Sequence, residues 1–145
     1  MTNVAKARES AVAAETRVEK TVLMVLDRLH ALNARLVALH GEIKSAQPVS
    51  SGSVCLELYP CGPGCAGCPH PRWVKYTWTV ETSEKPSVLL SINLDAKGRD
   101  PILTLARSTP HYEKTAALIR EAKSILIERK KILASIRALR NSARL

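Results

Sequence analysis

The most constraining feature of the chain is the segment from Cys61 to His70, which reads Cys-Gly-Pro-Gly-Cys-Ala-Gly-Cys-Pro-His. It holds three of the four cysteines and one of the four histidines, and glycine and proline fill most of the gaps. Because few apolar side chains are present, hydrophobic packing alone cannot fix its conformation. Thiolates and an imidazole on a turning backbone are ligands of structural zinc, and glycine permits the left-handed turns. The segment therefore predicts a structural Zn²⁺ site in a loop.

Cys61, Cys65 and Cys68 form the core of the expected ligand set, and the Cys65-x-x-Cys68 spacing is typical of a zinc knuckle. His70 and Cys55 compete for the fourth position. Cys55 lies in an alternating segment, where cysteine commonly acts as a small apolar residue. We therefore expect His70 as the fourth ligand, with Cys55 in reserve. Four protein ligands would close the coordination shell and leave no position for a catalytic water.

Disulfides, free thiols and an iron–sulfur cluster are the alternatives to zinc. Disulfides need an oxidising compartment, whereas residues 1–15 carry Glu9 and Glu15 and lack the apolar run of a secretion signal. No apolar run reaches the length of a membrane span. We therefore expect a cytoplasmic protein whose clustered Cys and His residues bind metal. A histidine in a Gly/Pro loop favours zinc over an iron–sulfur cluster.

An apolar seam runs through the first third of the chain. From Val18 to Ile43, apolar residues recur at alternating steps of four and three, which is the heptad pattern of a coiled coil. Arg8 and Glu15 interrupt the earlier part of the seam. The pattern predicts a helix over residues 3–46 that associates with a second copy or with a coiled-coil partner. The seam consists of Val4, Ala11, Val18, Val22, Val25, Leu29, Leu32, Leu36, Leu39 and Ile43.

Alternating segments in the middle of the chain predict a small antiparallel sheet. The expected strands are residues 54–59, 73–80 and 87–94, and residues 102–105 could form a fourth. The segment from Cys61 to His70, which we call the metal loop, would then join the first two strands. Tyr76 and Trp78 share one face of the second strand, and we expect this face, rather than that of Trp73, to pack beneath the helices.

A second long helix is predicted in the last third of the chain. Thr109 and Pro110 suit the cap and the first helical position, and periodic apolar residues continue to about Arg140. Arg129 lies within the apolar stripe, where its stem should pack while its guanidinium reaches solvent or an acid. The resulting α+β chain would form one integrated domain with three parts. These parts are a coiled-coil helix (1–47), a zinc-stabilised β region (48–106) and a basic helix (107–145).

The order of these features resembles a family of small bacterial and phage proteins of unknown function that is often linked to mobile elements. The resemblance rests on Gly52-Ser53-Val54 after a helix, on Cys61-Gly62-x-x-Cys65-x-x-Cys68, and on His70-Pro71-Arg72-Trp73-Val74-x-Tyr76, followed by strands and a charged helix. It covers residues 30–140. Here the first cysteine gap is shorter, and Pro71-Arg72 stands where the family has Gly-Pro-Tyr. The resemblance implies a Cys/His cluster and a mobile-element context, but no activity.

Positive charge is concentrated towards the C-terminus. The net charge is +9, and residues 96–145 hold twelve basic and four acidic residues. Basic residues that recur every seven positions on a helix form a stripe that can follow phosphates. A solvated helix face or an acidic protein partner would also account for them. The expected nucleic-acid-binding residues are Lys123, Lys130, Arg137 and Arg144 in the stripe, with Arg120, Lys131 and Arg140 beside it.

No catalytic arrangement can be defended from the sequence. It has no Ser–His–Asp order, phosphate-binding glycine loop or carboxylate pair, and we expect His30 and His40 at the surface of the first helix. We predict a non-enzymatic protein that binds nucleic acid, DNA before RNA, as an accessory or regulatory factor of a bacterial or phage mobile element. It would have no small-molecule substrate and no membrane association. The alternative is a protein–protein adaptor or inhibitor subunit that docks on a larger nucleoprotein complex.

Overall fold

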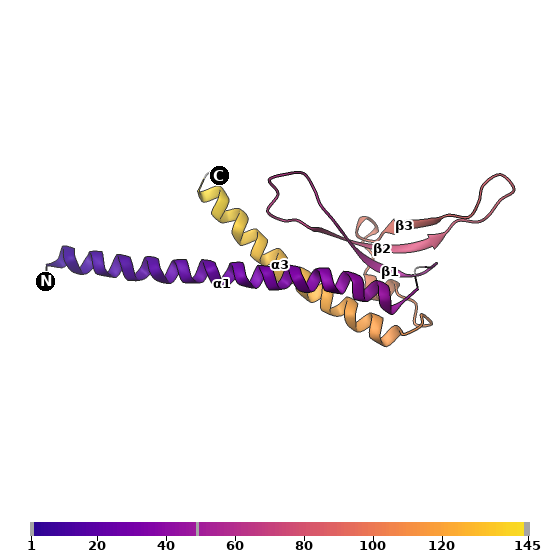
Figure 1. The fold of residues 1–145 in the computed structure, drawn as a ribbon, viewed down its shortest axis with the longest axis horizontal. Coiled ribbons are helices and arrows are strands. Elements are labelled where there is room, and N and C mark those ends of the chain that lie inside the picture. Colours follow the sequence, from indigo (N-terminus) through magenta and orange to yellow (C-terminus); the bar gives the residue numbers. More distant parts are fainter. Residues whose placement is uncertain (1, 49, 144–145) are drawn as a thin grey trace. The chain divides into compact units, whose positions relative to one another are not determined.

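A computed structural model provides the structure of the protein and describes residues 2–48 and 50–143. The chain has the expected α+β class: a long helix, a three-stranded sheet and a second long helix (Figure 1). The chain divides into two compact units, one ending at Ala34 and the other beginning at Arg35. The elements are α1 (Asn3–Ala46), β1 (Val54–Tyr59), β2 (His70–Trp78), β3 (Leu89–Asn93), a short 3₁₀ turn η1 (Asp95–Lys97), α2 (Pro101–Thr104) and α3 (Tyr112–Ser142).

The N-terminal unit is the first part of α1. Thr2 caps the helix, because its hydroxyl accepts a hydrogen bond from the Ala5 N–H at 3.1 Å. The apolar seam is exposed at the start of the helix, with Val18 62 % and Val22 48 % accessible to solvent. Val25 is half-buried, and the first buried residue of the seam is Leu29. The predicted bounds of this helix are confirmed. The heptad pattern runs through an exposed stretch up to Val22 and a buried stretch from Leu29 onward.

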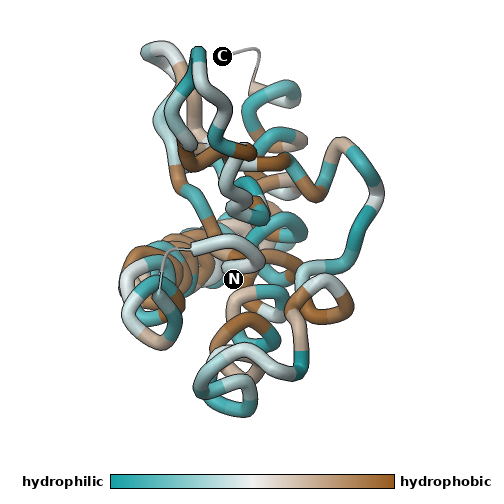
Figure 2. Tube along the Cα trace, turned by 90° about the vertical axis from the view of Figure 1, so that its right-hand side faces the viewer, coloured by the Kyte–Doolittle hydropathy of each residue, from teal (hydrophilic) through white to brown (hydrophobic). Residues whose placement is uncertain are grey.

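The hydrophobic core of the C-terminal unit lies between one face of the sheet, the end of α1 and α3. Apolar side chains on α3 recur with helical spacing, so brown and teal alternate along the helix that ends at the C label (Figure 2). Arg35 on α1 also forms a bidentate ion pair with Glu121 on α3, at 2.7 and 2.9 Å. The core consists of Leu36, Leu39, Ile43, Val54, Leu56, Trp73, Leu94, Leu105, Ala116, Ile119 and Ala122.

The sheet has the order β1-β2-β3, and both strand pairs are antiparallel. The expectation that Trp78 packs beneath the helices is wrong: Trp73 is 6 % exposed, whereas Trp78 is 48 % exposed. The register explains this difference, because Trp73 lies opposite Leu56 and therefore shares the core face of β1. Tyr76 points to the other face, is half-buried, and donates its hydroxyl proton to Glu57 Oε1 at 2.5 Å.

Two expectations about helix boundaries are also wrong. The segment expected as a fourth strand is the helix α2, because the Asp100 carboxylate accepts from the N–H groups of Ile102 and Leu103 and Pro101 occupies the first turn. The second long helix begins at Tyr112 rather than at Thr109-Pro110. It follows His111, whose φ of 56° and ψ of 36° place it in the left-handed region.

His40 differs from its expected surface position. Its side chain is half-buried, and its Nδ1 lies 2.5 Å from the carbonyl oxygen of Leu56. Since a carbonyl only accepts, Nδ1 carries the proton. His40 therefore links α1 to β1. None of the helices in the described part of the chain is long and apolar enough to cross a membrane.

The core assignment can be tested with two neighbouring residues of α1. Leu36 is fully buried, whereas Val37 is 55 % exposed. Leu36→Asp places an unpaired carboxylate in the core and should lower the free energy of unfolding by at least about 3 kcal/mol. Val37→Asp should change it by less than about 0.5 kcal/mol. Chemical denaturation followed by circular dichroism measures both values, and similar losses in the two variants would contradict the assignment.

Candidate metal centre

The loop between β1 and β2 brings the four expected ligands together. One donor atom from each of Cys61, Cys65, Cys68 and His70 lies within 4.8 Å of all the others. The sulfurs of Cys61 and Cys68 are 3.2 Å apart, and Cys65 Sγ lies 3.4 Å from His70 Nε2. Donors that bind one zinc ion at about 2.3 Å for sulfur and about 2.0 Å for nitrogen must lie this close together. The four residues are therefore close enough to bind a metal ion.

The strand pair closes the base of the metal loop. Tyr59, the last residue of β1, lies opposite His70, the first residue of β2, and their ring centroids are 5.9 Å apart. The guanidinium of Arg72 lies 4.8 Å from the centre of the Tyr59 ring, on the outer face of the sheet. Within the loop, Gly64 has a φ of 84°, which L side chains rarely adopt. The antiparallel pairing of β1 and β2 thus places His70 at the base of the loop. The turns of the loop bring the three cysteines close to it.

Backbone and side-chain donors point at the sulfurs. The Gly67 N–H lies 3.3 Å from Cys65 Sγ, and the Cys61 N–H lies 3.3 Å from Cys68 Sγ. The pKa of the Cys65 thiol is lowered to about 6 by hydrogen bonds from Cys61, the Gly67 N–H and His70. The pKa of Cys61 is raised to about 12, mainly through its hydrogen bonds to Cys68 and Cys65. Metal binding at this cluster must therefore release protons, and acid should oppose it.

Cys55 does not join the cluster. It is fully buried on β1, where it lies opposite Val74, and its sulfur is 3.8 Å from the side-chain nitrogen of Gln47. Burial is the main cause that raises the pKa of its thiol to about 11. It has the environment of a small apolar residue, as its place in an alternating strand indicates. The structure thus brings His70, and not Cys55, to the three loop cysteines.

Arg129 on α3 contacts the metal loop directly. It is 4 % exposed, and its Nη2 donates a hydrogen bond to the carbonyl oxygen of Gly67 at 2.8 Å. Of the two environments expected for its guanidinium, solvent is therefore wrong, and burial lowers the pKa of Arg129. The sequence places this arginine in the apolar stripe but gives no sign of its contact with Gly67 in the loop. The contact ties the glycine between Cys65 and Cys68 to the second long helix.

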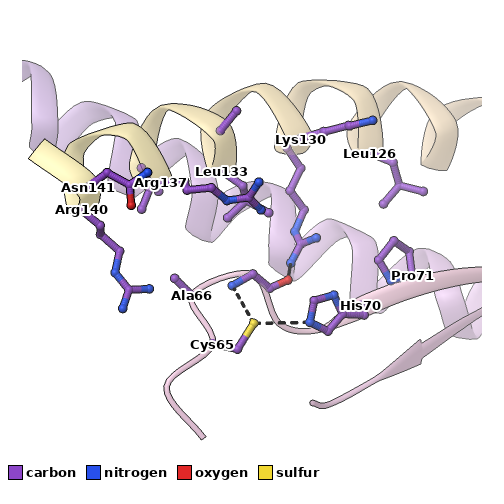
Figure 3. Close-up of a pocket in the computed structure, with 14 residues that line it drawn as sticks. Cys65, Ala66, His70, Pro71, Leu126, Lys130, Leu133, Arg137, Arg140 and Asn141 are labelled. Carbon is purple, nitrogen blue, oxygen red and sulfur yellow. Dashed lines mark hydrogen bonds between the residues drawn. The ribbon is translucent and has the colours of Figure 1, made fainter. Parts of the chain in front are cut away.

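A groove of about 690 Å³ lies between the metal loop and α3. Leu126, Leu133 and Ile136 supply apolar surface to it, and Lys130, Arg137 and Arg140 supply positive charge. In Figure 3, Leu126, Lys130, Leu133, Arg137 and Arg140 lie on α3, and Cys65 and His70 lie below that helix. Three of the predicted nucleic-acid-binding residues therefore line one groove, next to the candidate metal ligands.

The other predicted nucleic-acid-binding residues lie elsewhere. Arg120 and Lys131 are exposed on α3 outside the groove lining. Lys123 forms an ion pair with Asp100, with 2.5 Å between Nζ and Oδ2, and this hydrogen bond lowers the pKa of the Asp100 carboxyl. Arg144 lies outside the described residues.

Comparison of the chain with protein-family models, curated proteins and solved structures finds no match.

Metal analysis tests the ligand set. Purified protein should contain about one zinc ion per chain. Cys65→Ser and Cys68→Ser should each lose the metal and lower the melting temperature, because each removes one of four donors. Cys55→Ala is the matched control and should keep the metal, since Cys55 lies outside the cluster. Elemental analysis and thermal denaturation give both results. A metal-free wild type, or loss of zinc from the Cys55 variant, would contradict the assignment.

The contact between Arg129 and Gly67 should support the metal loop. Arg129→Met preserves much of the apolar stem but leaves the Gly67 carbonyl without this donor. We expect the apparent zinc affinity to fall by about tenfold, a common effect of removing a group that orients ligands. Competition with a chromogenic chelator measures the change. Lys130→Met alters the neighbouring exposed residue and should leave the affinity unchanged; equal effects of the two variants would argue against a supporting role.

Proposed function

We propose that the protein is a non-enzymatic nucleic-acid-binding protein that uses the basic half of α3. The observation that carries this proposal is the groove in which Lys130, Arg137 and Arg140 lie together on one helix. Lys130 and Arg137 are seven residues apart, or about 10 Å along a helix. Two cations at this separation would contact different phosphates of a nucleic-acid backbone.

The charges of these three residues are available to a ligand. All three are exposed, and none forms an ion pair with another residue in the described part of the chain. Lys123 differs because Asp100 already neutralises it. Phosphate binding through lysine and arginine releases counterions and does not require a pocket shaped to one sequence. The surface centred on the groove is therefore a better candidate for phosphate binding than the full stripe of basic residues that recur every seven positions.

The proposed role of the metal is structural. We propose Zn²⁺ as the ion, with Cys61, Cys65, Cys68 and His70 as its four ligands. A filled coordination shell would leave no position for a substrate. By fixing the loop, the site would hold the Gly67 carbonyl against Arg129 and keep one wall of the groove in place. This arrangement supports binding rather than catalysis.

The proposed ligand is double-stranded DNA. Of the two tryptophans of the sheet, Trp73 is buried in the core, and Trp78 is exposed but does not line the groove. The described lining of the groove contains no Phe, Tyr or Trp, and single-strand binding usually relies on such residues. A basic helix is an element that the major groove of DNA admits. The resemblance to a mobile-element family supports an accessory or regulatory role for a bacterial or phage mobile element.

A protein–protein adaptor is the second candidate function. The apolar part of the groove, formed by Leu126, Leu133 and Ile136, favours it. Phosphate backbones offer nothing to pack on such a surface, whereas an acidic amphipathic segment would cover it and pair with the surrounding cations. The partner would then be an acidic subunit of a larger complex.

The salt dependence of DNA binding separates the two candidates. Lys130→Glu combined with Arg137→Glu should weaken binding to unrelated duplexes alike. It should also reduce the slope of log affinity against log salt by about 0.9 for each lost phosphate contact. Fluorescence anisotropy over a salt series measures both effects. Lys97→Glu with Arg107→Glu changes the net charge equally, away from the groove, and should have a smaller effect.

Two outcomes would reject the nucleic-acid proposal or its surface. Absence of binding to both DNA and RNA at low salt would reject nucleic-acid binding and favour the adaptor. Binding that is unaffected by the groove variant but lost in the control variant would retain nucleic acid and move the surface elsewhere. Nuclease-treated protein that still retains an acidic partner through Lys130 and Arg137 would support the adaptor.

A further inference from the structure

The first part of α1 exposes an apolar seam. Val4 and Val18 are each 62 % exposed and Val22 is 48 % exposed, whereas Leu29 is 8 % exposed. Helices in proteins gain most of their stability from tertiary packing of an apolar face, and an exposed apolar face that continues a heptad pattern indicates a helical partner. The question is which helix covers the seam between Val4 and Val22.

The charged residues inside the seam restrict the answer. Arg8 and Glu15 are seven residues apart, so both occupy the same heptad position as Val22 and Leu29. Both are exposed in this structure. Arg8 and Glu15 therefore put a positive and a negative charge at the same position of successive heptads. Such a pattern on one helix can complement the same pattern on a second copy. Whether it does so depends on the relative direction of the two helices.

A parallel pair of identical helices would place like charges together. In that arrangement Arg8 faces Arg8 of the second copy and Glu15 faces Glu15, so both layers are repulsive. Arg8 and the Glu15 of the other copy would be seven residues apart along the axis, or about 10 Å. This separation leaves the opposite charges poorly placed to relieve the two repulsive layers.

An antiparallel pair brings the opposite charges together. With residue 13 at the two-fold axis, Val4 lies opposite Val22, and Arg8 lies opposite Val18. Glu15 of the second copy is then level with Ala11, only three residues from Arg8, or about 4.5 Å along the axis. Both side chains are long enough to bridge this offset. The symmetry of the pair generates the contact twice.

The same register suits the uncharged residues. Ala11 and Ala14 lie near the two-fold axis and allow the backbones to approach closely, and Val12, which is 61 % exposed, flanks the axis. The paired stretch runs from Val4 to Val22 and ends before Leu29, where the seam is already buried. All of the exposed part of the seam is therefore used, and no buried part is needed.

We propose that residues 4–22 of α1 form an antiparallel two-stranded coiled coil with the same residues of a second copy, with two ion pairs between Arg8 and Glu15. The occupant of the exposed seam is thus this chain itself. The interface requires neither the metal loop nor the basic groove, so it stands apart from the proposed function. It would place two groove-bearing units in one symmetric assembly.

Charge-reversal variants test the orientation. Arg8→Glu and Glu15→Arg each replace two attractive contacts of the antiparallel pair by two repulsive ones. Each should raise the dissociation constant of the dimer by about tenfold or more, as measured by sedimentation equilibrium. Arg8→Glu combined with Glu15→Arg restores the opposite charges and should return the constant to the wild-type range. In a parallel pair, each single reversal exchanges one like pair for another and should leave the constant unchanged.

The matched controls lie on the outer side of the same helix. Arg17→Glu and Glu9→Arg repeat the two charge changes at exposed positions away from the seam, and they should leave dimerisation within about threefold of the wild type. If they weaken the dimer as much as the seam variants do, net charge rather than the proposed contact is responsible, and the proposal is overturned. Circular dichroism checks that all variants remain helical.

Cross-linking provides a second measure of direction. A mixture of Val4→Cys and Val22→Cys proteins should form a heterodimeric disulfide under mild oxidation, because the two positions are opposite in the antiparallel pair. Val4→Cys alone should not cross-link, and wild-type protein accounts for the native cysteines. Efficient cross-linking of Val4→Cys with itself would establish the parallel direction. That result, or a monomeric wild type at every concentration up to the millimolar range, would overturn the proposal.

Discussion

The cluster of Cys61, Cys65, Cys68 and His70 and the carbonyl of Gly67 provide the main contacts of a segment that has few apolar side chains to pack. The loop between β1 and β2 is rich in glycine and proline, and its residues from Cys61 to Ala66 are exposed. Four donor atoms converge in it within 4.8 Å of one another, and a buried arginine donates one hydrogen bond to it. Because Arg129 belongs to α3, this hydrogen bond links the loop to the helix. A change in the cluster would reach the groove through this contact.

The basic residues of α3 that recur every seven positions are equivalent in the sequence but have different neighbours in the structure. In the sequence, Lys123, Lys130 and Arg137 are members of one seven-residue repeat. In the structure, Asp100 at the cap of α2 neutralises the first, whereas the other two line the groove beside the metal loop. The short helix α2 thus contributes to the charge distribution although it adds little to the core. A surface for an anionic partner is defined by which cations lack an internal partner as much as by their number.

Features with a local origin could be predicted from the sequence, and features with a long-range origin could not. The bounds of α1 follow from its heptad pattern, and the loop ligands follow from spacing within ten residues. The burial of Trp73 instead depends on its register against Leu56, which an alternating strand does not reveal. The partner of Arg129 lies 62 residues away in the chain. Residues 102–105 are expected from the sequence as a possible strand, whereas residues 101–104 form α2, because a short apolar run carries too little periodicity to distinguish a strand from a helix.

The heptad pattern of α1 illustrates a limit of periodicity itself. Steps of three and four residues require only that one face of the helix is covered, and they do not specify by what. Leu36, Leu39 and Ile43 are covered by the sheet and α3 of their own unit, whereas Val4, Val18 and Val22 remain exposed. The charged interruptions, Arg8 and Glu15, occur only in the exposed stretch. In a packed core these charges would be costly to bury. Between two copies running in opposite directions they would neutralise each other, so the imperfections of the repeat carry more information about its partner than its regular positions do.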